Sequence, residues 1–203
     1  MTSKTTQYTL LLASGMMFSA SLWASEDNRL SLMLNGTCMV CHGSQGSSVG
    51  PATPTIADMD SEDFVEAMME YKSGERPSTV MGRLAKGYTE DQFQMMADYF
   101  AKQPFVRYQQ TVDANKVKSG AKLHDKYCEK CHDDSGYNLN DDGATILAGQ
   151  WMPYLQFSLT DFHTSVRHMP RKMKNRMNKM VKEEGEKSLD ELVHFYGSLT
   201  EQK

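Results

Sequence analysis

The 203-residue sequence lacks the features that mark several large classes of protein. No apolar stretch reaches the roughly twenty residues that a helix needs to cross a bilayer, so no transmembrane segment is expected. Long β-branched runs are missing, which disfavours the βαβ setting of a thioredoxin-like protein. With 26 acidic and 22 basic residues the net charge is −4, so no nucleic-acid partner is expected. Cysteine is also scarce, and the four that occur carry the main chemical information.

These four cysteines belong to two copies of one pentapeptide, C-x-x-C-H. Its members are Cys38, Cys41 and His42 in the first copy and Cys128, Cys131 and His132 in the second. In each copy the two thiols can add to the vinyl groups of one haem, and the adjacent histidine can bind the iron as its proximal ligand. The sequence therefore predicts two covalently attached haem c groups.

Other uses of the cysteines are less consistent with the spacing. A zinc site would not require a histidine directly after the second cysteine of both pairs. A redox-active pair of the thioredoxin type would need the missing βαβ context. Two structural disulfides are conceivable in an exported protein, but two matching pentapeptides favour haem attachment.

Residues 1–24 have the order of a secretory signal peptide. Lys4 precedes an apolar stretch over about 8–18, and a small-residue region ends at Ala24, before an acidic segment. The apolar stretch is too short to anchor the chain in a membrane. Cleavage near Ala24 and a soluble periplasmic protein are predicted, which agrees with haem attachment outside the cytoplasm.

The chain also contains an internal repeat. Cys38 and Cys128 lie 90 residues apart, and similar residues follow each motif. We divide the chain after its signal into an N-terminal haem domain at 25–104, a linker at 105–115 and a C-terminal haem domain at 116–203. The fold class predicted is all-α, with two tandem helical haem domains.

Helical periodicity supports this division. Each half closes with an amphipathic pattern bearing an aromatic pair, Tyr99-Phe100 in the first and Phe195-Tyr196 in the second. Gly120 lies on the apolar stripe that precedes the second motif, where it would permit a close helix contact. We expect the helix before each motif to pack on the closing helix.

The sixth iron ligand of the first haem is predicted to be Met81. It lies 39 residues after His42, in a loop before a helical stretch and with a glycine behind it. Other methionines of this half fall within amphipathic patterns and are interpreted as packing residues. A thioether opposite histidine closes the coordination sphere and raises the reduction potential.

The second haem has more than one candidate. Met169 precedes Pro170, which suits the beginning of a helix over 171–184, and Met173 would face inward from within that helix. We favour Met169, because a loop ligand is easier to orient than one constrained by helical phase. His168 is a further alternative that would give a bis-histidine haem.

Charge is unevenly distributed along the chain. Residues 26–104 hold six basic and twelve acidic residues, whereas 105–203 hold fifteen and fourteen. Seven basic residues between 167 and 182 have no acid among them. Such a run is most often a solvated helix face, and it could also serve as a docking surface beside the second haem.

Several longer segments resemble one family, the dihaem cytochrome subunits of flavocytochrome c sulfide dehydrogenase, which are related to the cytochromes c4. The similar segments are CMVCHG at 38–43, VGPA at 49–52, YKSGERPSTVMGR at 71–83, LHDKYCEKCH at 123–132 and LAGQWMPYL at 147–155. The resemblance covers nearly all of the chain after the signal. The second half lacks the Gly-Pro pair of the first.

The resemblance implies two tandem class I cytochrome c domains, each enclosing one covalently attached haem. It also implies a partner subunit that binds FAD and oxidises sulfide, while this chain, not an enzyme on its own, passes electrons to a small soluble acceptor such as a cytochrome c. One alternative is a c4-type carrier that serves a terminal oxidase. A dihaem peroxidase or haem sensor would need an open iron position, against which Met81 and Met169 argue.

Overall fold

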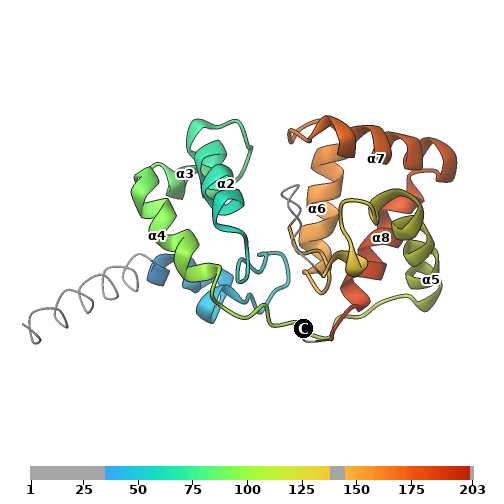
Figure 1. The fold of residues 1–203 in the computed structure, drawn as a ribbon, viewed down its shortest axis with the longest axis horizontal. Coiled ribbons are helices and arrows are strands. Elements are labelled where there is room, and N and C mark those ends of the chain that lie inside the picture. Colours follow the sequence, from blue (N-terminus) through green and yellow to red (C-terminus); the bar gives the residue numbers. More distant parts are fainter. Residues whose placement is uncertain (1–34, 138–144, 202–203) are drawn as a thin grey trace, which may run out of the picture.

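The structure of the protein is a computed structural model, and it describes residues 35–137 and 145–201. Within these ranges the regular structure is helical, which confirms the predicted all-α class. Figure 1 shows two helical units side by side, joined by an extended segment. The predicted signal peptide at 1–24 lies outside the described residues. No helix in the described ranges is both long and apolar enough to span a bilayer.

The first unit is built around its aromatic closing helix. Its elements are a helical stretch over 35–42, η1 (Ser44–Gly46), α2 (Ser61–Ser73), α3 (Met81–Ala85) and α4 (Glu90–Phe100). The side chain of Asp60 caps α2 by accepting backbone N–H bonds, and Gly74 ends it in a left-handed conformation. α2 packs on α3 and α4 around Phe64, Phe93 and Phe100, all of them buried.

The second unit has a larger helical core. Its elements are α5 (Ala114–Leu123), η2 (His124–Cys128), η3 (Asp134–Gly136), α6 (Met152–His163), α7 (Arg171–Glu184) and α8 (Lys187–Ser198). α5 crosses α8 closely at Gly120, where an added Cβ would lie 2.2 Å from the Glu191 carbonyl oxygen. The predicted close contact at this glycine is confirmed. Leu123, Leu192 and Phe195 are among the buried residues of this core.

The two units share a pattern of backbone hydrogen bonds. After each motif a glycine carbonyl accepts two N–H bonds from a later segment, and the next N–H of that segment donates to an aromatic residue of the closing helix. In the first unit, the N–H groups of Ile56 and Ala57 donate to the Gly46 carbonyl, and the Asp58 N–H donates to the Phe100 carbonyl. In the second unit, the N–H groups of Leu147 and Ala148 donate to the Gly136 carbonyl, and the Gly149 N–H donates to the Tyr196 carbonyl. Each haem motif is thereby tied to its closing helix in the same way.

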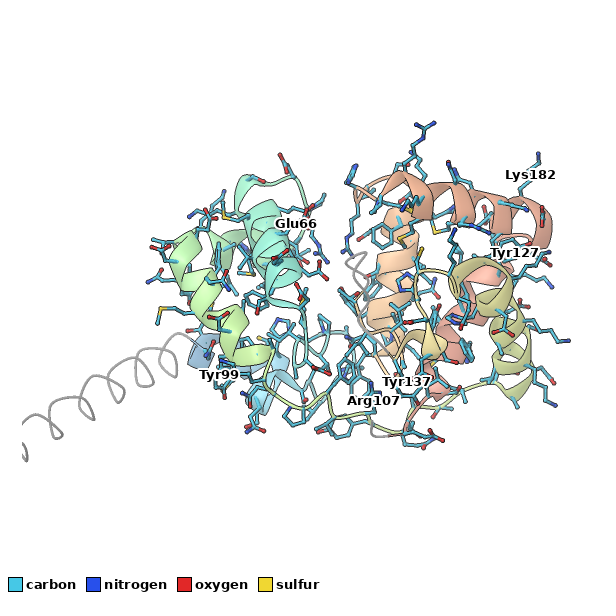
Figure 2. All side chains as sticks on the ribbon, in the orientation of Figure 1. Glu66, Tyr99, Arg107, Tyr127, Tyr137 and Lys182 are labelled. Atoms are coloured by element: carbon cyan, nitrogen blue, oxygen red, sulfur yellow. The ribbon has the colours of Figure 1, made fainter. Side chains whose placement is uncertain are left out.

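The segment between the units is extended and well bonded. It runs over 104–113, and α5 begins at Ala114, within the predicted linker. Arg107 is 7% exposed and lies between the units, as Figure 2 shows, with its guanidinium 4.7 Å from the Tyr137 ring centroid. Its Nε donates to the Ala148 carbonyl at 3.0 Å. The connecting segment therefore fastens to the second unit as well as leading into it.

Candidate haem-binding sites

The two C-x-x-C-H motifs lie on helical turns in both units. Cys38 and Cys41 lie on the helical stretch 35–42, and Cys128 ends η2 with Cys131 in the turn that follows. All four cysteines are free thiols, which leaves their sulfurs available for thioether bonds. Burial raises the pKa of the Cys128 thiol to about 11.

The first motif histidine is oriented by a single hydrogen bond. His42 is 8% exposed, and its Nδ1 lies 2.8 Å from the Pro54 carbonyl oxygen. A carbonyl can only accept, so Nδ1 carries the proton and Nε2 keeps its lone pair. Burial lowers the pKa of this imidazole, which favours its neutral form. This is the arrangement that a histidine ligand requires, with one nitrogen held by the protein and the other available to a metal.

The second motif histidine also offers a neutral nitrogen to an iron. Burial, reinforced by the charge of His124, lowers the pKa of His132 to about 4. Its Nδ1 is buried and has no hydrogen-bond partner among the described residues. A neutral, desolvated imidazole beside two free thiols has the donor chemistry of a c-type haem site. Both motifs therefore fit the predicted cofactor.

A buried histidine beside the second motif was not singled out from the sequence. His124 is fully buried, with Nδ1 2.9 Å from the Tyr196 hydroxyl and Nε2 2.5 Å from a carboxylate oxygen of Glu129. The Tyr196 hydroxyl also hydrogen-bonds to the Cys128 thiol. His124 and Glu129, with Asp125, could approach a metal ion. Because both His124 nitrogens already have partners, this group instead fastens the motif to α8.

Met81, the predicted ligand in the first unit, is the first residue of α3. It therefore begins a helix and does not lie in the loop before one. Its side chain is half-buried and packs against the core that contains Phe64 and Phe93. A helix terminus still positions a side chain firmly, so ligation by Met81 stays a prediction.

The candidates in the second unit differ in burial. Met169 is 7% exposed and lies in the segment before Pro170, the N-cap of α7, as the sequence predicted. Met173 is half-buried within α7, and both methionines contact the core of the second unit. His168 is exposed. The structure places these side chains without deciding which of the two methionines ligates.

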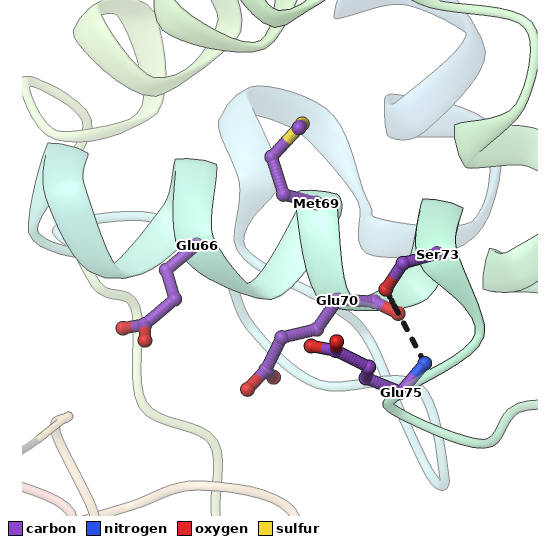
Figure 3. Close-up of a pocket in the computed structure, with 5 residues that line it drawn as sticks. All are labelled: Glu66, Met69, Glu70, Ser73 and Glu75. Atoms are coloured by element: carbon purple, nitrogen blue, oxygen red, sulfur yellow. Dashed lines mark hydrogen bonds between the residues drawn. The ribbon is translucent and has the colours of Figure 1, made fainter.

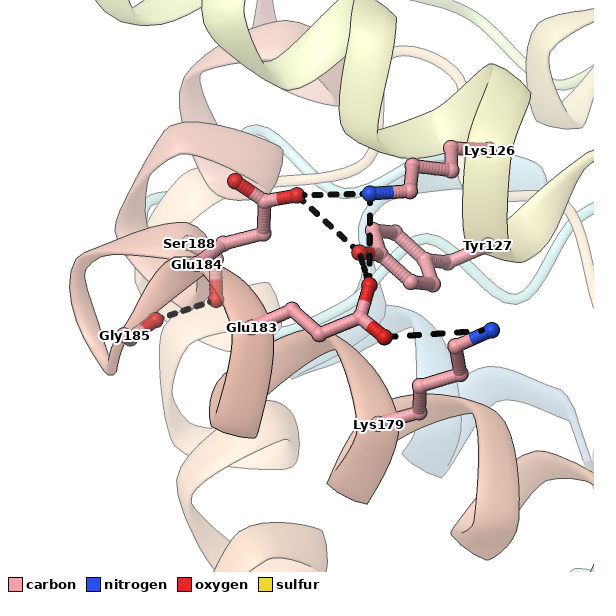
Figure 4. Close-up of polar contacts among 7 residues, drawn as sticks. All are labelled: Lys126, Tyr127, Lys179, Glu183, Glu184, Gly185 and Ser188. Atoms are coloured by element: carbon pink, nitrogen blue, oxygen red, sulfur yellow. Dashed lines mark hydrogen bonds and ion pairs between the residues drawn. The ribbon is translucent and has the colours of Figure 1, made fainter.

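The far end of α7 is attached to the turn that carries the second motif. The Tyr127 hydroxyl donates to Glu183 at 2.6 Å and to Glu184 at 3.0 Å, and Lys126 pairs with both carboxylates (Figure 4). These bonds lower the pKa of both glutamates. α7 is therefore held at its C-terminal end, while Met169 precedes its N-terminal end.

The basic residues between 167 and 182 lie mostly on the exposed face of α7. Met177 and Met180 take the buried face of that helix. The residues exposed to solvent are Arg171, Lys172, Lys174, Arg176, Lys179 and Lys182. This arrangement is that of a solvated helix face, and it leaves the docking interpretation as a prediction.

An open pocket on α2 is unrelated to the haem motifs. It is lined by Glu66, Met69, Glu70, Ser73 and Glu75 (Figure 3). None of the predicted haem ligands lines it. Nearby, burial and then the charges of neighbouring carboxylates raise the pKa of Asp63 to about 6. This acidic surface is a property of α2 and not of the haem site.

Comparison with known proteins identifies relatives of both halves. No protein-family model matches the chain. The cytochrome subunit of sulfide dehydrogenase from Chlorobaculum tepidum is 37% identical over 97 residues, which are 45% of this chain and 87% of that protein. Cytochrome c4 from Pseudomonas aeruginosa is 29% identical over 138 residues, which are 64% of this chain and 68% of that protein.

The fold has a solved counterpart. Reduced cytochrome c4 from Pseudomonas stutzeri superimposes with a TM-score of 0.71 at 23% identity, over 83% of this chain and 96% of that one. This likeness confirms two class I cytochrome c domains. With two C-x-x-C-H motifs, one buried and one partly buried motif histidine and these relatives, the chain belongs to the c-type cytochromes and is a cytochrome c4-like dihaem electron carrier.

Proposed function

We propose that this chain is the electron-transfer subunit of a periplasmic sulfide dehydrogenase. It would accept electrons from an FAD-containing partner subunit and pass them to a small soluble acceptor such as a cytochrome c. The observation that carries this proposal is the 37% identity to a sulfide dehydrogenase cytochrome subunit across 87% of that protein. The proposal adds an electron donor and an electron acceptor to the dihaem carrier.

We assign the iron ligands within this proposal. Cys38 and Cys41 hold the first haem and Cys128 and Cys131 the second, as thioethers. The axial pairs are His42 with Met81 and His132 with Met169, with Met173 as the alternative to Met169. Haem supplies one-electron chemistry, and a thioether opposite an imidazole favours the reduced state. The neutral, desolvated imidazoles of both motif histidines support this assignment.

Two haems suit the proposed electron donor. Oxidation of sulfide at a flavin releases electrons in pairs, whereas a cytochrome acceptor takes one at a time. A carrier with two one-electron sites can receive both electrons from one flavin turnover. The protein contributes fixed positions for the two sites, because the units are bonded to each other directly and through the connecting segment.

Reconstitution tests the proposal. Sulfide would be mixed anaerobically with the oxidised cytochrome, with and without a flavoprotein purified from the same periplasm, and haem reduction followed by its absorbance. We expect fast reduction of both haems with the flavoprotein and only a slow background with the chain alone. Equal rates in the two mixtures, or no complex between the two proteins, would refute the assignment.

A c4-type carrier to a terminal oxidase is the second candidate. One observation supports this candidate. The likeness to cytochrome c4 extends over both units, whereas the sulfide dehydrogenase relative matches 45% of this chain. This candidate predicts that quinol-reduced membranes reduce the cytochrome and that an oxidase reoxidises it, without any flavoprotein. Measuring both routes on one preparation separates the candidates.

Methionine variants test the axial ligands independently of the partner. Each iron–thioether bond contributes a long-wavelength charge-transfer band to the oxidised spectrum. Met81→Ala and Met169→Ala should each remove about half of that band and lower the potential of one haem, and Met173→Ala should leave it unchanged. If Met173→Ala reduces the band and Met169→Ala does not, the second ligand is Met173.

A further inference from the structure

One side chain of the second unit contacts the backbone that holds His42 in the first. Gln150 is 5% exposed and precedes α6. Its Oε1 accepts the Thr55 N–H at 2.9 Å, and its Nε2 donates to the Thr55 carbonyl at 3.0 Å. The amide therefore satisfies both backbone groups of one buried residue that lies 95 positions earlier in the chain.

The Thr55 N–H belongs to the same peptide group as the Pro54 carbonyl. That carbonyl accepts the hydrogen bond from His42 Nδ1 at 2.8 Å. The Gln150 side chain, one peptide plane and the motif imidazole thus form a continuous chain of two hydrogen bonds. Hydrogen bonds in such a chain polarise each other, since an amide whose N–H is donating becomes a better acceptor at its carbonyl.

We propose that Gln150 is a positioning residue through which the second unit tunes the haem of the first. By accepting from Thr55 N–H, it strengthens the Pro54 carbonyl as acceptor from His42. A stronger bond at Nδ1 makes the imidazole a more basic ligand, and a more basic ligand stabilises ferric iron. The contact between Gln150 and Thr55 therefore lowers the potential of the first haem. This inference rests on the proposed ligation of that haem by His42.

The surroundings of Gln150 keep its side chain in this register. Its own carbonyl accepts from Gln110 Nε2 at 3.0 Å, and Gln110 Oε1 accepts from the Met152 N–H at 2.8 Å. The Trp151 N–H donates to Gln150 Oε1 at 3.1 Å. The Trp151 N–H thereby orients the carboxamide toward Thr55, and Gln110 fixes the backbone from which the Gln150 side chain extends.

A second contact between the units supplies a matched control. The Trp151 indole N–H donates to the Ser48 carbonyl at 3.0 Å, and the ring lies against Gly50. This bond also joins the two units, but it does not involve the Pro54–Thr55 peptide. Trp151→Phe should therefore remove one bond between the units and leave the Gln150–Thr55 pair in place, whereas Gln150→Leu removes that pair.

The test compares these variants by redox titration followed by NMR, in which each haem has its own signals. For Gln150→Leu we expect the one-electron equilibrium of the first haem to shift about threefold toward the reduced form. At 59 mV per tenfold change, this raises the reduction potential of that haem by about 30 mV. The second haem should be unchanged, and Trp151→Phe should move neither. Exchange of the Thr55 amide proton, a readout independent of haem chemistry, should accelerate in Gln150→Leu.

The outcomes separate the inference from the assignment on which it rests. An unchanged potential in Gln150→Leu, or an equal shift in Trp151→Phe, would overturn the relay. If no paramagnetically shifted His42 ring appears in the unmodified protein, the ligation itself is wrong. Should the leucine variant fail to fold, Gln150→Asn keeps the amide but is one methylene too short to reach Thr55, and the same shift is expected.

Discussion

Replacing Gly120 by alanine probes the helix contact that supports the second haem motif. The new Cβ would lie 2.2 Å from the Glu191 carbonyl oxygen and 2.7 Å from Phe195 Cβ. Ordinary contacts begin near 3.4 Å, so α5 and α8 must move apart by about 1 Å, because a backbone oxygen and a Cβ cannot rotate away. Overpacking of this kind costs about 1–3 kcal/mol.

The expected net effect can be worked out. Alanine is favoured over glycine within a helix by about 1 kcal/mol, which offsets part of the cost. Because the clash is between a backbone oxygen and a fixed Cβ, we place its cost at the upper end, which leaves about 2 kcal/mol of destabilisation. For a domain of this size that lowers the melting temperature by about 10 °C.

Thermal unfolding of the haem-loaded protein, followed by far-ultraviolet circular dichroism, measures this change. Gly87→Ala is the matched control, because its Cβ would meet only the Leu84 carbonyl at 3.4 Å. Its stability should stay within about 0.5 kcal/mol of the unmodified protein. A Gly120→Ala protein that melts together with the control would refute the close packing of α5 and α8.

Three other predictions concern separate parts of the protein. The pKa of Asp63 is raised from 3.8 to about 6, so the folded state holds this proton more tightly and the ionised carboxylate destabilises the fold above pH 6. After solvent screening is allowed for, Asp63→Asn should gain about 1 kcal/mol at pH 8 in urea unfolding, and the gain should shrink toward pH 4. Glu75→Gln, an exposed carboxylate outside the group that acts on Asp63, should show no such trend. Tyr127→Phe loses the hydroxyl that donates to Glu183 and should lower the melting temperature by a few degrees with unchanged haem content, and an unaltered melting curve would contradict this role. Cys131→Ala should leave the second haem on a single thioether, so its reduced absorption band should shift while total haem remains two per chain, as a pyridine haemochrome assay would reveal.

Much of the fold followed from local patterns. The helix periodicities predicted α4, α7 and α8, because apolar spacing along a helix depends only on neighbouring residues. The first closing helix ends earlier than the domain boundary predicted at 104, since α4 stops at Phe100. Helix ends depend on capping and on tertiary contacts as well as on proline.

The second axial ligand shows where local reasoning stops. Met169 and Met173 lie four residues apart, one before α7 and one within it, and either spacing from the motif is compatible with ligation. The burial of Met169 and the exposure of His168 come from the packing of α7 on the second core, which no local pattern encodes. Met81, the ligand proposed for the first unit, was chosen from the sequence, which did not show that it begins α3.

The sequence by itself determined the chemistry of this protein, because haem attachment requires two thiols and a histidine within five consecutive residues. It also determined the duplication, since both motifs are followed by similar segments. Only the tertiary structure decided how the two units influence each other. The bonds from Gln150 to Thr55 and from His124 to Tyr196 join residues 95 and 72 positions apart. A glutamine or a histidine in isolation carries no information about a partner that only folding brings within 3 Å.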